Sequence, residues 1–276
     1  MQLAPTDVVI DAQEAAVFRR LRAVWDARAL VVYFVRRDLV GRYRPTSLGR
    51  AWVFLRPAAE LLTYVLVFGF ILKVRTADMP YALFLAAGLV PWLFFAQTVS
   101  GSADSLASAR HIMSKVHFPR LVVPLSNMGL ALVDLVVLSG VVLVLALAYG
   151  MPLGLPLLAL PFFLGLLVLL AFGVSLIVAA ASVSSPDVAV GVPVALRVLM
   201  YLSPVVYPRS LVPAEWLVLY DANPIATILT GVRWSLGSAV APGPVELAFA
   251  CLVVAGTLAV GTLAFLRTER QMADFL

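Results

Sequence analysis

Charged side chains inside long apolar runs are the groups of this sequence best placed to do chemistry. A charge at the centre of a bilayer costs on the order of 2.5–3.5 kcal/mol, so such residues usually face a bundle interior or a water-filled cavity. Asp134 lies 14 residues into an apolar run of 29 residues and is the best candidate for a buried polar contact or a ligand-facing group. Arg56, four residues before Glu60, can pair with it on one helix face. A structural use is favoured for all four residues of this kind: Glu60, Asp134, Arg197 and Glu246.

The sequence gives little support for metal binding, catalysis or ATP binding by this chain. The single Cys251 lies in an apolar run, and His111 and His117 are six residues apart, which is not one helical face. We therefore expect no metal site and no catalytic residue. Neither Lys73 nor Lys115 is preceded by the glycine of a G-x-x-x-x-G-K-[ST] phosphate loop, so any ATP must be bound by another subunit.

The composition indicates the elements that position these residues. Hydrophobic residues make up 62% of the 276 residues and charged residues 13%, and the mean hydropathy is +1.01. The apolar residues gather in runs near 20 residues long, the length that crosses about 30 Å of hydrocarbon as a helix. Strands of a barrel would alternate instead. The sequence therefore predicts an all-α polytopic membrane protein.

Six membrane-spanning helices are expected in this fold. A polar cytoplasmic lead precedes them in residues 1–54, with an amphipathic helix at 29–43 that is suited to the membrane interface. Residues 55–276 then form the six-span domain. The spans are predicted at 55–72, 81–101, 121–149, 153–181, 188–207 and 245–266.

Basic residues predict the orientation of these spans. Fifteen Lys and Arg residues fall on the side of the termini and four on the other side, so the positive-inside rule places both termini in the cytoplasm. The same rule accounts for the sequence pI near 9.7 without nucleic acid as a partner.

The segment 208–244 is apolar but too interrupted by proline and glycine to cross the membrane again. With Asn223 as a cap and Pro224 at a helix start, it predicts two short re-entrant helices on the outer side. We expect a cavity there to accommodate Glu215, Asp221 and Arg233, which would be costly in hydrocarbon. Trp216 and Tyr220, four residues apart, share one helical face and are predicted to form an outer gate.

Four ordered segments carry a resemblance to a known family. They are RRDLVGRYR at 36–44, GLVPW at 88–92, KVHFPR at 115–120 and LSPVVYP at 202–208. Together they resemble ABC-2 type polysaccharide and teichoic acid export permeases over residues 30–270. One departure is the segment SSPD at 184–187, where many members carry a basic residue before the aspartate, which puts contacts made there in doubt.

The resemblance implies a homodimer in the bacterial inner membrane, bound to two copies of a separate ATPase that holds Mg-ATP. A polysaccharide linked to polyprenyl diphosphate would pass along the dimer interface. The 104–120 loop, as a short cytoplasmic helix, would couple to the ATPase. The alternative is that its basic residues only follow the positive-inside rule and contact no partner. The coupling residues would be His111, Lys115, Phe118, Pro119 and Arg120, and those of the interfacial gate helix Arg36, Arg37, Asp38, Tyr43 and Arg44.

Aromatic rings can stack on sugars without forming a deep binding well, although most aromatics near span ends are interfacial anchors. The conduit aromatics are expected to be Tyr64, Phe68, Tyr201 and Tyr207. Two alternatives remain. One is a polyprenyl-phosphate-directed glycosyltransferase, which normally needs paired carboxylates for Mg²⁺, whereas the cytoplasmic loops offer only Asp104 and Asp187. The other is an ABC-2 drug or lipid exporter.

Overall fold

The computed structural model describes residues 23–43, 47–76, 78–113 and 118–272, which form helices and no strand. The all-α prediction is therefore confirmed for this part of the chain. The longer helices are α2 (Arg28–Tyr43), α3 (Trp52–Tyr64), α4 (Tyr81–Met113), α5 (Val122–Ala148), α6 (Leu160–Ser184), α7 (Asp187–Leu202), α9 (Pro224–Ser235) and α10 (Pro244–Met272). The short pieces are η1 (Gly49–Ala51), η3 (Leu155–Ala159), η4 (Arg209–Leu211), η5 (Ala214–Trp216) and α8 (Leu217–Asp221), and α3 continues as a π-helix, η2 (Val65–Ile71).

Five helices of the described chain are long and apolar enough to cross a membrane: 52–71, 81–105, 122–148, 155–184 and 244–268. The sixth expected span, 188–207, corresponds to α7, which has 16 residues. At 1.5 Å per residue α7 rises about 24 Å, less than the hydrocarbon thickness. Its helix ends before Ser203, because the following Pro204 disfavours helical geometry there. The six-span count therefore stays a prediction.

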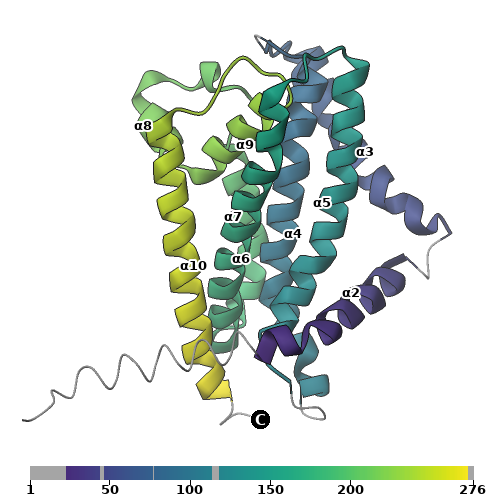
Figure 1. The fold of residues 1–276 in the computed structure, drawn as a ribbon, viewed down its shortest axis with the longest axis vertical. Helices are drawn as coiled ribbons and strands as arrows, with labels where there is room; N and C mark the ends of the chain where they lie inside the picture. The colour runs from purple at the N-terminus through teal and green to yellow at the C-terminus, as the bar shows by residue number, and fades with distance from the viewer. Residues whose placement is uncertain (1–22, 44–46, 77, 114–117, 273–276) are drawn as a thin grey trace, which may run out of the picture.

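The bundle is built around α4, which packs against α5, α6, α7 and α9. Helix α10 packs along α6, and α2 lies obliquely across one end of the bundle against α5 (Figure 1). The last turns of α10 lie at this same end, and α8 and α9 lie at the opposite end (Figure 1). We refer to these as the α2 end and the α8 end. No side chain of α3 or η2 is buried, so this helix is only loosely covered by the rest of the chain.

Glycines allow a close contact between helices α6 and α10. A Cβ at Gly173 would lie 2.8 Å from the backbone nitrogen of Leu258, and a Cβ at Gly261 would meet the carbonyl oxygen of Gly173. Small residues of this kind let membrane helices approach backbone to backbone, where van der Waals packing supplies the attraction. The α6–α10 contact therefore depends on the absence of a side chain at these two positions.

Gly173→Val is expected to destabilise the protein by about 1–3 kcal/mol, because the added methyl groups meet backbone atoms that cannot rotate away. The measurement is the thermal unfolding midpoint of the purified protein in detergent. Gly165→Val is the matched control, since Gly165 lies on the same helix and a Cβ there would have no atom within 4 Å. Equal midpoints for the two variants would show that the close approach contributes nothing.

The segment 208–244 forms η4, η5, α8 and α9, none of them long enough to cross a membrane. Helix α9 begins as its sequence predicts, with the Asn223 side chain accepting a hydrogen bond from the Ile225 amide at 3.0 Å and Pro224 in the first turn. Most of its side chains are buried against α4, α6 and α10. The α8 end of the bundle is therefore closed by a short helix packed among long ones.

A buried arginine fixes α9 in this place. Arg233 is 5% exposed; its Nε donates to the Phe84 carbonyl at 3.1 Å and its Nη2 to the Val205 carbonyl at 3.0 Å. The guanidinium also lies 3.5 Å from the centroid of the Phe84 ring. Backbone carbonyls and an aromatic face accommodate this charge, so the expectation that a cavity would do so is wrong for Arg233. Asp221, another charge of that expectation, pairs with Arg209.

Burial lowers the pKa of Arg233 to about 9, which leaves the group protonated at neutral pH. Gly88 provides the space for it, because a Cβ there would overlap the guanidinium and lie 2.9 Å from the Val205 carbonyl oxygen. This gives Gly88 a packing role in α4. The arginine thus connects α4, α9 and the turn after α7.

Candidate functional site

The predicted coupling segment is placed differently from expectation. Helix α4 runs without interruption to Met113, so residues 104–113 extend a membrane helix and do not form a separate short one. The side chain of His111 and all of Lys115 lie outside the described residues. Phe118, Pro119 and Arg120 follow in the turn that leads into α5.

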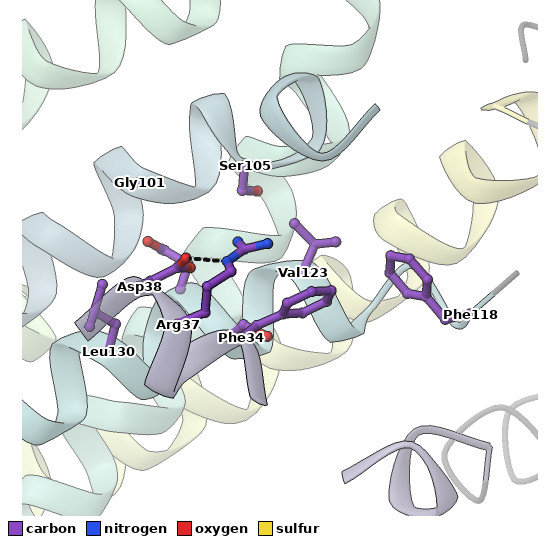
Figure 2. A pocket seen from close by; sticks show the side chains of 10 residues that line it. Phe34, Arg37, Asp38, Gly101, Ser105, Phe118, Val123 and Leu130 are labelled. Carbon is purple, nitrogen blue, oxygen red and sulfur yellow. Dashed lines mark hydrogen bonds and ion pairs between the residues drawn. The ribbon is translucent and has the colours of Figure 1, made fainter. Parts of the chain in front are cut away.

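Phe118 lies against the interfacial helix. Its ring meets that of Phe34 on α2 edge to face, with 5.9 Å between centroids and 63° between planes. The Arg37 guanidinium lies 4.8 Å from the Phe34 ring centroid and donates from Nε to Asp38 at 2.8 Å. These side chains surround a small cavity of about 170 Å³ (Figure 2). We call this cavity, with Phe34, Arg37, Asp38 and Phe118, the α2 junction.

The α2 junction joins two of the predicted residue sets. Arg37 and Asp38 come from the gate-helix set and Phe118 from the coupling set. Arg36, also of the gate-helix set, is exposed and does not line the cavity. Of the other gate-helix residues, the side chain of Tyr43, at the end of α2, and all of Arg44 lie outside the described residues. Sequence reasoning missed Phe34. It was not among the predicted site residues, although it belongs to the amphipathic pattern of 29–43 and is the one buried residue of 28–42.

Asp134 makes the buried polar contact that the sequence predicts. Its carboxylate accepts a hydrogen bond from Arg42 of α2 at 2.7 Å, and the two side chains are 15% and 30% exposed. Gln97 of α4 lies beside the pair and, with its amide oxygen turned toward Arg42, accepts from Nη2 at 2.7 Å. The partner residues were not foreseen, because α2 and α5 are 92 positions apart at this contact. The contact fastens α2 to the bundle.

The Arg42–Asp134 pair borders a cavity of about 620 Å³ between α2, α3, α4 and α5. Arg56 and Glu60 also line it, and within the described residues they make no ion pair with each other. The four charges sum to zero. Arg197, the remaining basic residue of a predicted span, is exposed on α7, so the bundle interior of this single chain does not hold it.

The predicted conduit aromatics and outer gate meet at the α8 end. Phe68 from η2 and Tyr207, Trp216 and Tyr220 line one groove of about 700 Å³, together with aliphatic side chains. We call it the aromatic groove. Its aliphatic lining is Leu72, Val74, Leu199, Leu202, Leu211, Val212, Pro213, Leu219 and Ala222.

The two predicted gate residues have different surroundings. Tyr220 is 7% exposed and Trp216 is 60% exposed. Burial raises the pKa of the Tyr220 phenol. Of the conduit set, Tyr64 packs near Phe68 with ring centroids 6.2 Å apart, and Tyr201 receives a hydrogen bond from the Tyr207 hydroxyl on its carbonyl at 2.7 Å. The six aromatics therefore form one neighbourhood.

These features define an all-α polytopic membrane protein with polar contacts concentrated at helix junctions. The chain belongs to the ABC-2 type transporter family, whose model matches residues 29–236. It is 30% identical to the O-antigen export system permease protein RfbA of Myxococcus xanthus, over 79% of this chain and 84% of that protein. It is 29% identical to RfbA of Klebsiella pneumoniae, over 74% and 78% of the two chains. The polysialic acid transport protein KpsM of Escherichia coli is 25% identical over 85% and 91%.

Proposed function

We propose that this chain is the membrane-spanning subunit of an ABC exporter that moves a lipid-linked polysaccharide across the bacterial inner membrane. Membership of the ABC-2 family supports a transport subunit rather than an enzyme. The similar proteins from three bacteria are named for O-antigen export or polysialic acid transport. A polysaccharide linked to polyprenyl diphosphate is therefore the substrate class that we assign.

The α2 junction is the structural observation that carries the mechanism. Phe118 stands between the end of α4 and the start of α5, and its ring touches Phe34 of α2. A partner ATPase that presses on the Phe118–Arg120 segment would therefore move α2 as well. In this proposal two copies of the chain bind two copies of the ATPase, which holds Mg-ATP, and the α2 end and both termini face the cytoplasm. Tyr64 and Tyr201, next to each other in the aromatic neighbourhood, would face the polymer.

The double variant Phe118→Ala/Arg120→Ala is expected to uncouple ATP hydrolysis from export. Export per ATP hydrolysed should fall about fivefold or more, since coupling energies between sites are typically about 1–3 kcal/mol. The measurement uses the chain reconstituted with its co-expressed ATPase in proteoliposomes, with ATP turnover and lumenal polymer determined on the same samples. The chain without the ATPase should hydrolyse no ATP.

Phe34→Ala is the matched control for this experiment. It removes the same ring contact from the α2 side and leaves Phe118 and Arg120 unchanged. Loss of coupling in both variants would place the effect in the α2 contact, and loss in the first alone would place it at the ATPase surface. Full export at normal ATP turnover by the double variant would contradict the coupling role.

A further inference from the structure

Two polar side chains that line the aromatic groove, Asn223 and Tyr207, are already hydrogen-bonded within the chain. The Asn223 side chain caps α9 through its oxygen and donates from Nδ2 to Ser203 at 2.9 Å. The Tyr207 hydroxyl donates to the Tyr201 carbonyl at 2.7 Å. A sugar needs hydrogen-bond partners as well as an aromatic face, and apart from the Tyr220 hydroxyl and the Trp216 indole nitrogen the remaining lining side chains are hydrocarbon. The chemistry of the groove therefore suits an alkyl chain better than a saccharide.

Two cations flank this groove on the side of η2. Lys73 and Arg75 stand on either side of Val74, which lines the groove, and both are exposed. Neither makes a hydrogen bond or an ion pair to any residue that the structure describes. They are thus available to an anion outside the chain.

The backbone at Lys73 gives an independent indication. Its φ is +51°, the only positive φ of a non-glycine residue in the described chain. The Val74 amide donates to the Phe68 carbonyl at 2.8 Å and closes the end of the π-helix η2 around Lys73, and a residue with positive φ is usually glycine. A long cationic residue in this strained conformation suggests a use for its side chain.

Acidic residues directly adjoin the groove residues of η5 and α8, whereas Asp78, which follows η2, accepts hydrogen bonds from Ser238 and Ala239. Asp221 forms an ion pair with Arg209, and hydrogen bonding to Asp221 raises the pKa of Arg209. Glu215 precedes Trp216 in η5. An anionic group would therefore lie on the η2 side, beside Lys73 and Arg75, with its hydrocarbon in the groove.

We propose that the aromatic groove binds one acyl chain of an anionic phospholipid, whose phosphate is held by Lys73 and Arg75. The volume of about 700 Å³ falls in the range of single-ligand pockets. The surrounding leaflet supplies such lipids at high local concentration, and Phe68, Tyr207, Trp216 and Tyr220 serve as hydrocarbon contacts. This site does not depend on the exported substrate.

The test uses the purified full chain in detergent, titrated with phosphatidylglycerol and read by native mass spectrometry. Lys73→Gly with Arg75→Gln should weaken phosphatidylglycerol binding about fivefold for each cation removed, the effect of one basic residue near an anionic lipid surface. Lys73→Gly is chosen because glycine keeps the helix end and relieves its strain. Val212→Trp, which fills the groove, should remove the bound lipid in a chain with both cations intact.

Arg267→Gln is the matched control, since Arg267 is an exposed cation at the α2 end of α10; it should bind phosphatidylglycerol as the wild type does. Phosphatidylcholine should bind more weakly than phosphatidylglycerol. Unchanged binding in the double cation variant, or in Val212→Trp, would overturn the proposal. Displacement of phosphatidylglycerol by equimolar polyprenyl phosphate would also overturn it, because the occupant would then be a carrier lipid. If the wild-type chain bound phosphatidylglycerol in this way but its complex with the ATPase exported no polysaccharide, the result would count against the proposed function alone.

Discussion

Arg233→Ala is expected to destabilise the protein by about 3–5 kcal/mol, because two buried carbonyls each lose a hydrogen bond to a charged donor, worth about 1.5–3 kcal/mol apiece. The variant loses two hydrogen bonds to carbonyls and the contact with Phe84, and it leaves a cavity beside Gly88. The Val205 carbonyl accepts from the guanidinium within a turn, so it would be left without this partner. The measurements are the thermal midpoint in detergent and protease sensitivity of the 203–223 segment.

Two further variants separate the contributions of side-chain volume, hydrogen bonding and charge to this loss of stability. Arg233→Met restores most of the volume but no hydrogen bond, so it should remain destabilised by about 1–3 kcal/mol, the cost of an unsatisfied buried acceptor. Arg233→Lys keeps the charge but offers a point donor in place of a planar fork, so it should lie between the wild type and Ala. Arg267→Ala, exposed at the other end, is the control. A wild-type midpoint for Arg233→Ala would show that the arginine does not hold α9.

Asp134→Arg is expected to release α2 from the bundle, because it places two guanidinium groups where an ion pair stands. The pair is partly exposed, so the expected loss is about 1–3 kcal/mol, below that of a fully buried pair. The Arg42→Asp/Asp134→Arg double variant should recover most of it. Spin labels at Val40 and Val137, both exposed, in a Cys251→Ala background measure the distance from α2 to α5.

Recovery in the charge-swapped protein is the decisive observation, because a general packing defect at either position would not be corrected by the second substitution. A broad distance distribution is expected for Asp134→Arg and a narrow one for the swap. If the single and double variants give the same narrow distribution as the wild type, the ion pair does not position α2.

Local pattern was enough to predict much of the fold. Run length and polarity predicted an all-α chain, the short helices of 208–244 and the cap at Asn223, since each depends on neighbouring residues. The α7 boundary was not predicted, because apolar residues continue beyond Ser203 while Pro204 ends the helix. The extension of α4 to Met113 was not predicted either, because polarity marks where a membrane ends but not where a helix does.

Contacts between distant segments were the part that the sequence could not supply. Asp134 was a good candidate for a polar contact, but nothing along the chain identifies Arg42 as its partner. Among the described residues, Arg233 contacts backbone carbonyls and a ring and no acidic side chain. Since every residue has a backbone carbonyl, the sequence does not indicate which ones accept a hydrogen bond from an arginine. Gly88 could be recognised as part of a motif, but its packing role depends on an arginine 145 positions later.

The order of these contacts along the chain bears on how the protein is made. Both carbonyls that receive Arg233 belong to residues synthesised earlier, Phe84 and Val205. During synthesis from the N-terminus, both acceptor carbonyls are already present when α9 leaves the ribosome. The guanidinium can therefore be hydrogen-bonded as soon as it enters the membrane. A circular permutant that begins at Pro224 would reverse this order. It would present the charged helix to the insertion machinery before any acceptor exists, and we expect it to insert poorly even though every contact of the finished structure is available to it.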